Sequence, residues 1–295
     1  MKQLSLNDIQ AAAARLRGKA VVTPLLSNIE LNRRAEAEIY IKPENLQHIG
    51  AFKFRGAYNR LSQFSEQQRQ AGAVAFSSGN HAQGVALAAK MLGMPATIVM
   101  PKDAPAVKVA GTKSLGAEIR FYDRWQESRE EIAQDISEQT GKVVVPAYDD
   151  LDIMAGQGTC GLECVEQLQE MGMTAEVFLC PVGGGGLIAG LSTAVKALVP
   201  SVKVLGVEPD LFDDHLHSKK AGSRQKIEGT PESICDALLA PMPGKLTWSV
   251  NSRTVDEFLS VTDAEVEEAV RFAFRYLKLV VEPGGAVALA ALLSG

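Results

Sequence analysis

The sequence has 295 residues and a net charge of −5, with 46% hydrophobic and 22% charged residues. This composition is ordinary for a soluble globular protein, and the length allows one large domain or two ordinary ones. No run of lysine or arginine interrupts the slightly acidic chain, so we expect neither nucleic acid nor an anionic membrane surface as a partner.

The N-terminal part begins with a capped helix. Ser5, with Asp8 three positions later, forms a capping box that predicts a helix to about Arg17, closed by Gly18. Alternating residues then predict a short strand over 38–42.

Strands and helices alternate from Gly72 onward. We expect strands at 73–76, 96–100, 117–121, 177–180 and 202–207. Helices are expected from the turn at 77–80 to about 92, at 105–115, from about 125, and after 186. This order predicts parallel strands joined by right-handed crossovers.

The C-terminal part has a second capping box. Thr262 and Glu265 predict the start of a helix. The apolar face of this helix is expected to comprise Val266, Ala269, Val270, Ala273, Phe274 and Leu277. A further helix is expected at 282–293.

The cysteine pattern and the N-terminal sequence both bear on the cellular compartment of the protein. Cysteine occurs four times, without CxxC spacing and without the density of a disulfide scaffold. It therefore predicts small buried side chains in a reducing environment. The first residues lack the apolar core of a signal peptide, and no apolar stretch approaches the length of about 18 residues that a membrane helix needs. We expect a cytoplasmic protein.

A lysine between two phenylalanines is the first candidate for chemistry. Lys53 lies between Phe52 and Phe54, and Arg55 follows two positions later. Apolar flanks and a nearby cation both disfavour the ammonium form, so we expect a lowered pKa and a nucleophilic amine at Lys53. The alternative is an ordinary lysine that extends to solvent from the start of a helix.

A polar turn at residues 77–81 is the second candidate. Ser77, Ser78, Asn80 and His81 lie where a strand is followed by a helix. Ligands of parallel sheets bind beyond the carboxyl ends of strands, so this turn is expected to face a cleft. The alternative is simple helix capping by serine or asparagine, and an isolated histidine is more often structural.

A glycine bend at residues 183–186 is the third candidate. Four successive glycines between a strand and a helix allow backbone N–H groups to converge on a phosphate. A dinucleotide is one possible ligand, because Gly184, Gly186 and Ala189 fit its fingerprint and Glu208 follows Gly186 by 22 positions. A nicotinamide-dependent oxidoreductase is thus an alternative, but it leaves the lysine stretch and the polar turn without a role.

Four motifs together carry a resemblance. They are ENLQHIGAFKFRGAY, SSGNHAQG, GQGT at 156–159 and GGGGLIAG. In their order and spacing they resemble the fold type II pyridoxal-phosphate enzymes, and most of all the serine racemase and serine/threonine dehydratase family, from about residue 21 to the end. The resemblance implies an α/β fold of the tryptophan synthase β type, with two domains that each have a mostly parallel sheet flanked by helices. A small domain at 72–149 would be inserted in a large cofactor-binding domain at 1–71 and 150–295, and a homodimer is expected.

The resemblance also assigns site residues. It implies that Lys53 holds pyridoxal 5′-phosphate as a Schiff base, that Phe52 packs on its ring, and that Asn80 bonds its 3-hydroxyl oxygen. The phosphate would be held by Gly183, Gly184, Gly185 and Gly186. The residues implied around a small amino-acid substrate are Ser77, Ser78, Asn80, His81, Arg129 and Asp236. For Arg129, a surface ion pair is the alternative.

The expected reaction is β-elimination, which converts L-serine, L-threonine or 3-hydroxyaspartate to a 2-oxo acid and ammonia. Ser78 occupies the position of the racemase's acid/base on the second face of the substrate, so serine racemisation is an alternative at the same site. A catalytically inactive regulator of the same fold would keep the glycines without needing Lys53.

A metal site is expected at the turn 208–214. Carboxylates at both ends suit Mg²⁺, Mn²⁺ or Ca²⁺, and the resemblance assigns Glu208, the carbonyl of Phe212, and Asp214. His215 and His217 suggest zinc, although we expect histidines of a solvated loop to be unliganded. An acidic surface turn without metal is the other alternative.

Two departures from the family affect the site. The family continues past the last helix into a strand and a Ser-Gly-Gly-Asn turn whose serine bonds the pyridine nitrogen, whereas this sequence ends at Gly295. Ala240 stands where the racemase carries a pocket serine. The contact to the pyridine nitrogen and the substrate side chain therefore stay unassigned.

Overall fold

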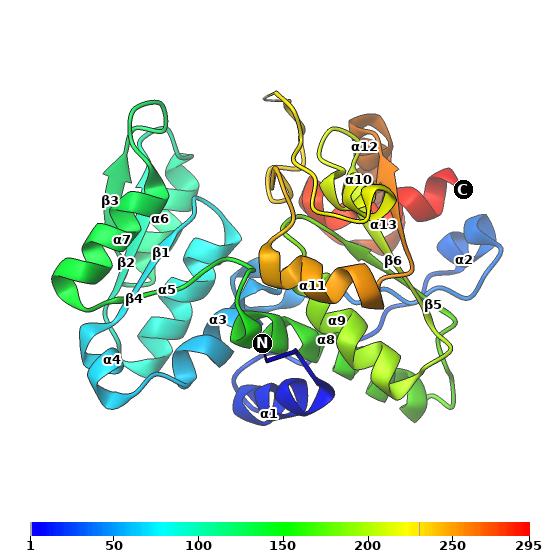
Figure 1. Ribbon diagram of the computed structural model, residues 1–295. Coiled ribbons are helices and arrows are strands. Elements are labelled where there is room, and N and C mark those ends of the chain that lie inside the picture. The colour runs from blue at the N-terminus through cyan, green and yellow to red at the C-terminus, as the bar shows by residue number, and fades with distance from the viewer. Residues whose placement is uncertain (1, 230) are drawn as a thin grey trace.

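Short apolar strands pair in parallel and form two sheets, which lie in separate lobes of the computed structural model (Figure 1). The structure describes residues 2–229 and 231–295. The small sheet has the order β3-β2-β1-β4, with β1 Ala73–Phe76, β2 Ala96–Pro101, β3 Glu118–Tyr122 and β4 Val143–Val144. The large sheet has the order β5-β6-β7, with β5 Val177–Pro181, β6 Lys203–Pro209 and β7 Glu257–Val261.

Helices cover both faces of the small sheet because its residues alternate in direction. Ala73 and Ala75 pack with α3 and α5, whereas Val74 between them packs toward α7. The helices of this lobe are α3 Lys53–Ser62, α4 Glu66–Ala71, α5 Asn80–Leu92, α6 Ala106–Ser114 and α7 Arg129–Thr140. Helix α3 also packs on α8, so it connects the two lobes.

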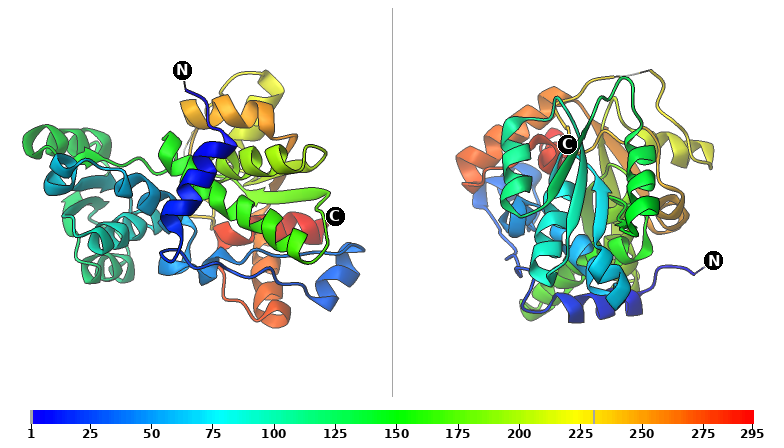
Figure 2. Two further views of the ribbon diagram at one scale, coloured as in Figure 1. Left: turned by 90° about the horizontal axis from the view of Figure 1, so that it is seen from below. Right: turned by 90° about the vertical axis from the view of Figure 1, so that its left-hand side faces the viewer.

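The large sheet is covered in the same way (Figure 2). Phe178 and Cys180 pack on the side of α9, and Leu179 packs on the side of α13. The helices of this lobe are α1 Leu6–Leu16, α2 Ile29–Ala35, α8 Leu151–Glu170, α9 Gly186–Leu198, α10 Asp214–Ala221, α11 Lys245–Thr254, α12 Asp263–Phe272 and α13 Pro283–Ser294. Short 3₁₀ turns at Glu44–Leu46 and His48–Gly50 precede α3, and a π turn at Ala273–Leu277 follows α12.

The predicted elements are largely confirmed. The capping boxes of α1 and α12 both form, and each predicted strand from 73 onward occurs within two residues of its expected ends. No helix among the residues that the structure describes has the length and apolar character needed to span a bilayer.

Three expectations were wrong. Residues 38–42 make only one isolated antiparallel bridge, Leu26 to Ile41, instead of a strand. Helix α7 begins at Arg129 and not near 125, because the Ser128 hydroxyl caps it by accepting from the Glu131 N–H. The side chain of Phe274 is 66% exposed, whereas Phe272 is buried, because the π turn after α12 shifts the face that meets the core.

Candidate active site

The three motifs meet at one cavity of about 1770 Å³, lined by residues of both lobes. Lys53, the polar turn 77–81 and the glycine bend 183–186 all line it. The polar turn follows β1 and the glycine bend follows β5, so the carboxyl ends of strands from both sheets open toward the same space. The fold therefore brings the Lys53 amine, the serine hydroxyl groups and a backbone bend suited to binding phosphate into one site.

Lys53 is the first residue of α3, and its Nζ donates a hydrogen bond to the Ala147 carbonyl at 3.0 Å. The ring of Phe52 lies with its centroid 5.2 Å from the same nitrogen. Burial lowers the pKa of Lys53 to about 8, while the carboxylate of Glu282 opposes this shift. The expected lowering is thus present and its main cause is burial.

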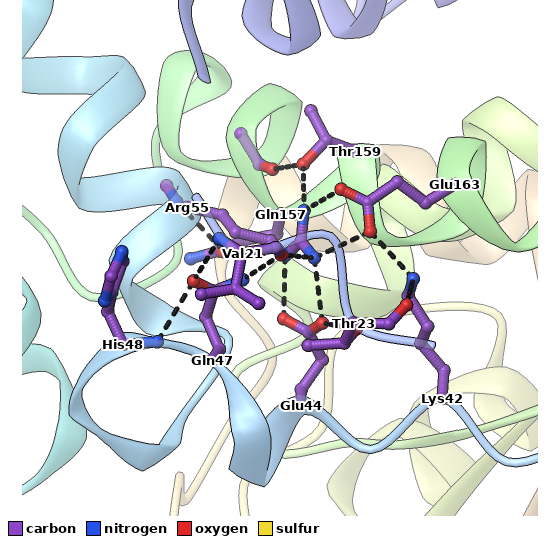
Figure 3. Close-up of polar contacts among 12 residues, drawn as sticks. Val21, Thr23, Lys42, Glu44, Gln47, His48, Arg55, Gln157, Thr159 and Glu163 are labelled. Carbon is purple, nitrogen blue, oxygen red and sulfur yellow. Dashed lines mark hydrogen bonds and ion pairs between the residues drawn. The ribbon is translucent and has the colours of Figure 1, made fainter. Parts of the chain in front are cut away.

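Arg55 does not provide the cation effect expected from its position, because acids neutralise it (Figure 3). Its fully buried guanidinium pairs with Glu44 at 2.7 Å and with Glu163 at 2.6 Å. Glu163 also pairs with Lys42 at 2.7 Å. Burial alone would lower the pKa of Arg55, but its hydrogen bonds to the two glutamates raise it above the ordinary value. We call these four residues the Arg55 cluster. It ties the first turn of α3 to α8 and so helps to fix Lys53.

The polar turn presents free donors to the cavity. Ser77 Oγ accepts from the Gly79 N–H at 3.1 Å, and Asn80 opens α5. Among the described residues, the N–H groups of Ser78, Asn80 and His81 have no protein acceptor. Such groups at a helix start favour an anion.

The imidazole of His81 faces the core. Its Nε2–H donates to the Val145 carbonyl at 2.9 Å, and its Nδ1 is buried without a partner. Burial, with a smaller effect from the charge of Lys53, lowers the pKa of His81 to about 4. His81 is therefore neutral at pH 7, and only its backbone N–H is directed by α5 toward an anion.

The glycine bend leaves four consecutive N–H groups, of Gly183, Gly184, Gly185 and Gly186, without an acceptor among the described residues. Gly185 has a φ of +88°, which favours glycine. A Cβ at Gly184 would lie 2.4 Å from the ring of Tyr148, so no other residue fits there without a shift. The Thr247 hydroxyl and the Asn251 amide hold the carbonyls of Gly184 and Gly185.

Arg129 and Asp236 line the cavity but have other partners. Arg129 pairs with Glu130 at 2.9 Å, and its guanidinium lies 5.4 Å from the centroid of the Phe76 ring. Asp236 pairs at 2.5 Å with Lys108, which belongs to the other lobe. Ala240 lines the cavity as well.

Two of the three predicted metal residues, Glu208 and Asp214, lie with His215 in a buried cluster behind the glycine bend. Glu208, Asp214 and His215 place one ligand atom each within 4.8 Å of the others. Both carboxylate oxygens of Asp214 are buried and lack a hydrogen-bond donor of good geometry. Phe212 lies in the turn between the two acids.

His215 corrects the expectation of a solvated loop, because it is fully buried. Its Nδ1 lies 3.2 Å from Glu208 and 3.4 Å from Asp214. Although burial alone would lower it, these two carboxylates raise the pKa of His215 to about 9. Glu208 also accepts from two backbone N–H groups, of His215 and Leu216, so it is not open to a ribose as the dinucleotide alternative required.

Two cavity residues were missed by the sequence analysis. Tyr148 packs its ring against the glycine bend, and Glu282 accepts a hydrogen bond from Asn80 at 2.6 Å. Glu282 stands before Pro283 at a helix start, a pattern that indicates capping and gives no signal of contact with a turn 202 residues away. Tyr148 lies in the loop after β4, two positions past Pro146, where no periodic pattern exists.

Comparisons with known proteins agree with this geometry. The family model described as pyridoxal-phosphate dependent enzyme matches residues 17–295. L-threo-3-hydroxyaspartate ammonia-lyase of Pseudomonas sp. is 46% identical over 292 residues, which cover 99% of this chain and 90% of the relative. Serine racemase of Schizosaccharomyces pombe is 43% identical, covering 97% and 87%. The solved structure of T.th. threonine deaminase superposes with a TM-score of 0.93 at 42% identity, covering 98% and 92%.

Proposed function

Because the chain belongs to the pyridoxal-phosphate dependent enzyme family, we propose that it is an ammonia-lyase that converts a small hydroxy amino acid to a 2-oxo acid and ammonia. The observation that carries the proposal is the meeting of the Lys53 amine, the polar turn and the glycine bend at one cavity. 3-Hydroxyaspartate, L-threonine and L-serine are the substrates to test, since relatives are named for each of these amino acids.

The residues present fit the cofactor. The unpaired N–H groups of the glycine bend and the N-terminus of α9 suit its phosphate. Lys53 would hold its aldehyde carbon through Nζ, since a lysine with a lowered pKa is nucleophilic near neutral pH. Phe52 and Asn80 line the same cavity and would contact its ring and its 3-hydroxyl oxygen.

Each step of the elimination has a residue of this chain. The bound cofactor supplies an electron sink that stabilises negative charge at the substrate Cα. Lys53 takes the Cα proton, and the free N–H groups at the start of α5 hold the substrate carboxylate. The bond between Cβ and its oxygen then breaks, and the hydroxyl leaves as water with the proton that Lys53 took from Cα. The enamine that is released takes up water and gives the 2-oxo acid and ammonia.

Racemisation is a second candidate that one observation favours. The hydroxyl of Ser78 lines the cavity and has no hydrogen-bond partner among the described residues. A hydroxyl group on the opposite face of the substrate from Lys53 would return a proton there. Ser78→Ala is therefore expected to remove D-serine formation and to leave 2-oxo acid formation largely unchanged.

The proposal is tested with purified protein and added pyridoxal 5′-phosphate. We expect a visible band at about 410 nm from the lysine-bound cofactor, and formation of 2-oxo acid from at least one of the three substrates. Lys53→Ala should lose both, whereas Lys90→Ala on the exposed side of α5 should lose neither. Absence of 2-oxo acid with all three substrates would refute the lyase proposal.

We also propose that Glu208 and Asp214, with the carbonyl of Phe212, hold Mg²⁺, Mn²⁺ or Ca²⁺. The two buried oxygens of Asp214 support this, since neither makes a hydrogen bond of good geometry, the His215 ring lies 3.4 Å away, and a hard cation would satisfy them. This cluster lies directly behind the glycine bend, because the His215 ring lies against Gly185. A cation bound there would offset the negative charge of the two carboxylates.

A homodimer in the cytoplasm completes the proposal. Apolar side chains are exposed where α2 meets the π turn and the segment after it; they are Ile29 at 90%, Phe274 at 66% and Val280 at 80% exposure. Hydrogen bonds from Asn28 to the carbonyl of Tyr276 and from Asn45 to that of Val280 hold these segments together. Four buried free cysteines are compatible with a reducing compartment.

A further inference from the structure

Glu282 is an acidic residue of the cavity wall that has no role in the proposed elimination reaction. It precedes Pro283 in extended conformation, with φ −72° and ψ 153°, and its side chain makes no hydrogen bond to the start of α13. Its carboxylate instead accepts from Asn80 Nδ2 at 2.6 Å, across the cavity and from the other lobe.

This hydrogen bond selects one orientation of the Asn80 amide. A carboxylate accepts but does not donate, so the NH₂ end of the amide must face Glu282. The NH₂ group has a second hydrogen, which remains available to an acceptor in the cavity. An oxygen of a bound ligand next to Asn80 would therefore meet a donor and not the amide carbonyl.

Glu282 also supplies the negative charge that acts on the Lys53 amine. His81, on the first turn of α5, is neutral at pH 7 because its pKa is about 4. Apart from burial, the carboxylate of Glu282 is the influence that changes the pKa of Lys53, and it raises that pKa.

Two groups of charged residues around the site are paired among themselves. Lys108 from α6 pairs with Asp236. Arg55 on α3 is enclosed by Glu44 and Glu163. These pairs present little net charge to the amine, so the contribution of Glu282 is not duplicated.

We propose that Glu282 is a positioning residue of the active site, whose carboxylate fixes the Asn80 amide and contributes a negative charge to the cavity that Glu282 and Lys53 both line. The inference rests on the proposed function, because Lys53 and Asn80 are there assigned to one bound cofactor. Glu282→Gln removes the charge and keeps a hydrogen-bond partner for Asn80, but glutamine can accept or donate and so no longer dictates which end of the Asn80 amide faces it. Glu282→Ala removes both.

The first experiment uses the protein without cofactor. Trace acetic anhydride labels neutral amines, and mass spectrometry of the Lys53 peptide across pH 6–11 gives the midpoint of its reactivity. We expect a midpoint of about 8 in the unmodified protein, and a midpoint lower by about half a unit or more in Glu282→Gln. A variant that merely unfolds would move the other way, toward about 10.4. Glu131→Gln, an exposed acid on α7, is the matched control and should leave the midpoint unchanged.

The second experiment measures affinity for pyridoxal 5′-phosphate by the visible band. Glu282→Gln should bind within about threefold of the unmodified protein, and Glu282→Ala should bind about tenfold more weakly, because only alanine leaves the Asn80 amide without a hydrogen-bond partner at this position. Equal labelling midpoints in all variants, or equal affinities of the glutamine and alanine variants, would overturn the inference even in an active enzyme. Absence of elimination in the unmodified protein would refute the proposed function and leave the labelling result valid.

Discussion

At the scale of single residues, the site depends on groups that are left without partners. The N–H groups of the glycine bend, the Ser78 hydroxyl and the Asp214 carboxylate all lack hydrogen-bond partners of good geometry in the described chain. Buried polar groups of folded proteins are nearly always paired. The unpaired donors in the cavity and the unpaired carboxylate behind it therefore indicate binding sites, for an anionic ligand and for a cation respectively.

A substitution at Gly184 tests whether the glycine bend binds the phosphate. A Cβ at this position would lie 2.4 Å from the Tyr148 ring, so Gly184→Ala should lower the free energy of unfolding by about 2 kcal/mol and weaken binding of pyridoxal 5′-phosphate. Denaturant titration and the visible band measure the two effects. Gly111→Ala, inside α6, is the control. Its Cβ would lie an ordinary 3.6 Å from Gln83 of α5, and helix propensity favours alanine by about 1 kcal/mol. Unchanged stability of Gly184→Ala would contradict the close contact with Tyr148.

Asp214 tests the metal cluster. Mg²⁺ that binds only the folded chain should raise the melting temperature of metal-free protein, by about 3 °C or more once the ion is well above its dissociation constant. Asp214→Asn should abolish this rise, because a neutral amide replaces a buried carboxylate ligand. His217→Asn is the control, since His217 lies on the same helix but is largely exposed. A melting temperature that is indifferent to Mg²⁺, Mn²⁺, Ca²⁺ and EDTA would exclude the site.

At the scale of elements, α3 places the reactive amine and the Arg55 cluster holds α3. Arg55 is fully buried, and its guanidinium bridges the 3₁₀ turn of Glu44 and the α8 residue Glu163. A buried charge is tolerated only when it is paired, so the cluster fixes the relative position of three segments. Lys53 lies two residues before Arg55 in the first turn of α3, so the cluster also fixes the position of the Lys53 backbone.

Glu163→Gln is expected to remove one of the two acidic partners of Arg55 and the acidic partner of Lys42 together. The free energy of unfolding should fall by about 2–3 kcal/mol, which is less than for a completely buried pair because Glu163 is partly exposed. Chemical denaturation followed by circular dichroism measures it. Glu166→Gln, on the exposed side of the same helix, should change stability by less than about 0.5 kcal/mol. Similar losses in both variants would mean that the cluster does not hold α3.

Elements whose signals are local were predicted correctly from the sequence. Ser5 with Asp8 and Thr262 with Glu265 each define a helix start by contacts within four residues, and the structure confirms both. Position in a strand-to-helix turn was likewise enough to bring the polar turn and the glycine bend to one cavity.

Features set by distant partners were not predicted. The neutralisation of Arg55 depends on Glu163, 108 residues away, and the contact of Glu282 with Asn80 spans 202 residues. The burial of His215 follows from packing under β7 and α11, as its ring contacts with Phe258 and Trp248 show. The exposure of Phe274 follows from a π turn, for which the sequence has no recognised signal.

At the scale of the whole molecule, the cavity lies between two lobes that polar contacts hold together. Lys108 of α6 pairs with Asp236, and Asn80 of α5 bonds to Glu282; in each case a residue of the small-sheet lobe meets one of the large-sheet lobe. Contacts of this kind at a partly exposed rim are weak individually. Opening of this rim would therefore break only these polar contacts, while α3 stays packed on α8 and keeps the two lobes joined behind the cavity.

The exposed apolar residues where α2 meets the π turn lie outside this rim and predict a second contact surface. Scattered apolar side chains are normal on a protein surface, but Ile29 and Phe274 lie on segments that the hydrogen bond from Asn28 to Tyr276 joins, and Val280 follows the same π turn. Two copies meeting through this surface by a twofold axis would cover it on both at once. We expect the protein to elute as a dimer in size-exclusion chromatography with light scattering, and the double variant Ile29→Asp, Phe274→Asp to elute as a folded monomer. Val107→Asp together with Trp125→Asp, at exposed apolar positions of the small-sheet lobe, should leave the dimer intact. A dimer that survives the first pair and dissociates with the second would place the interface on the other lobe.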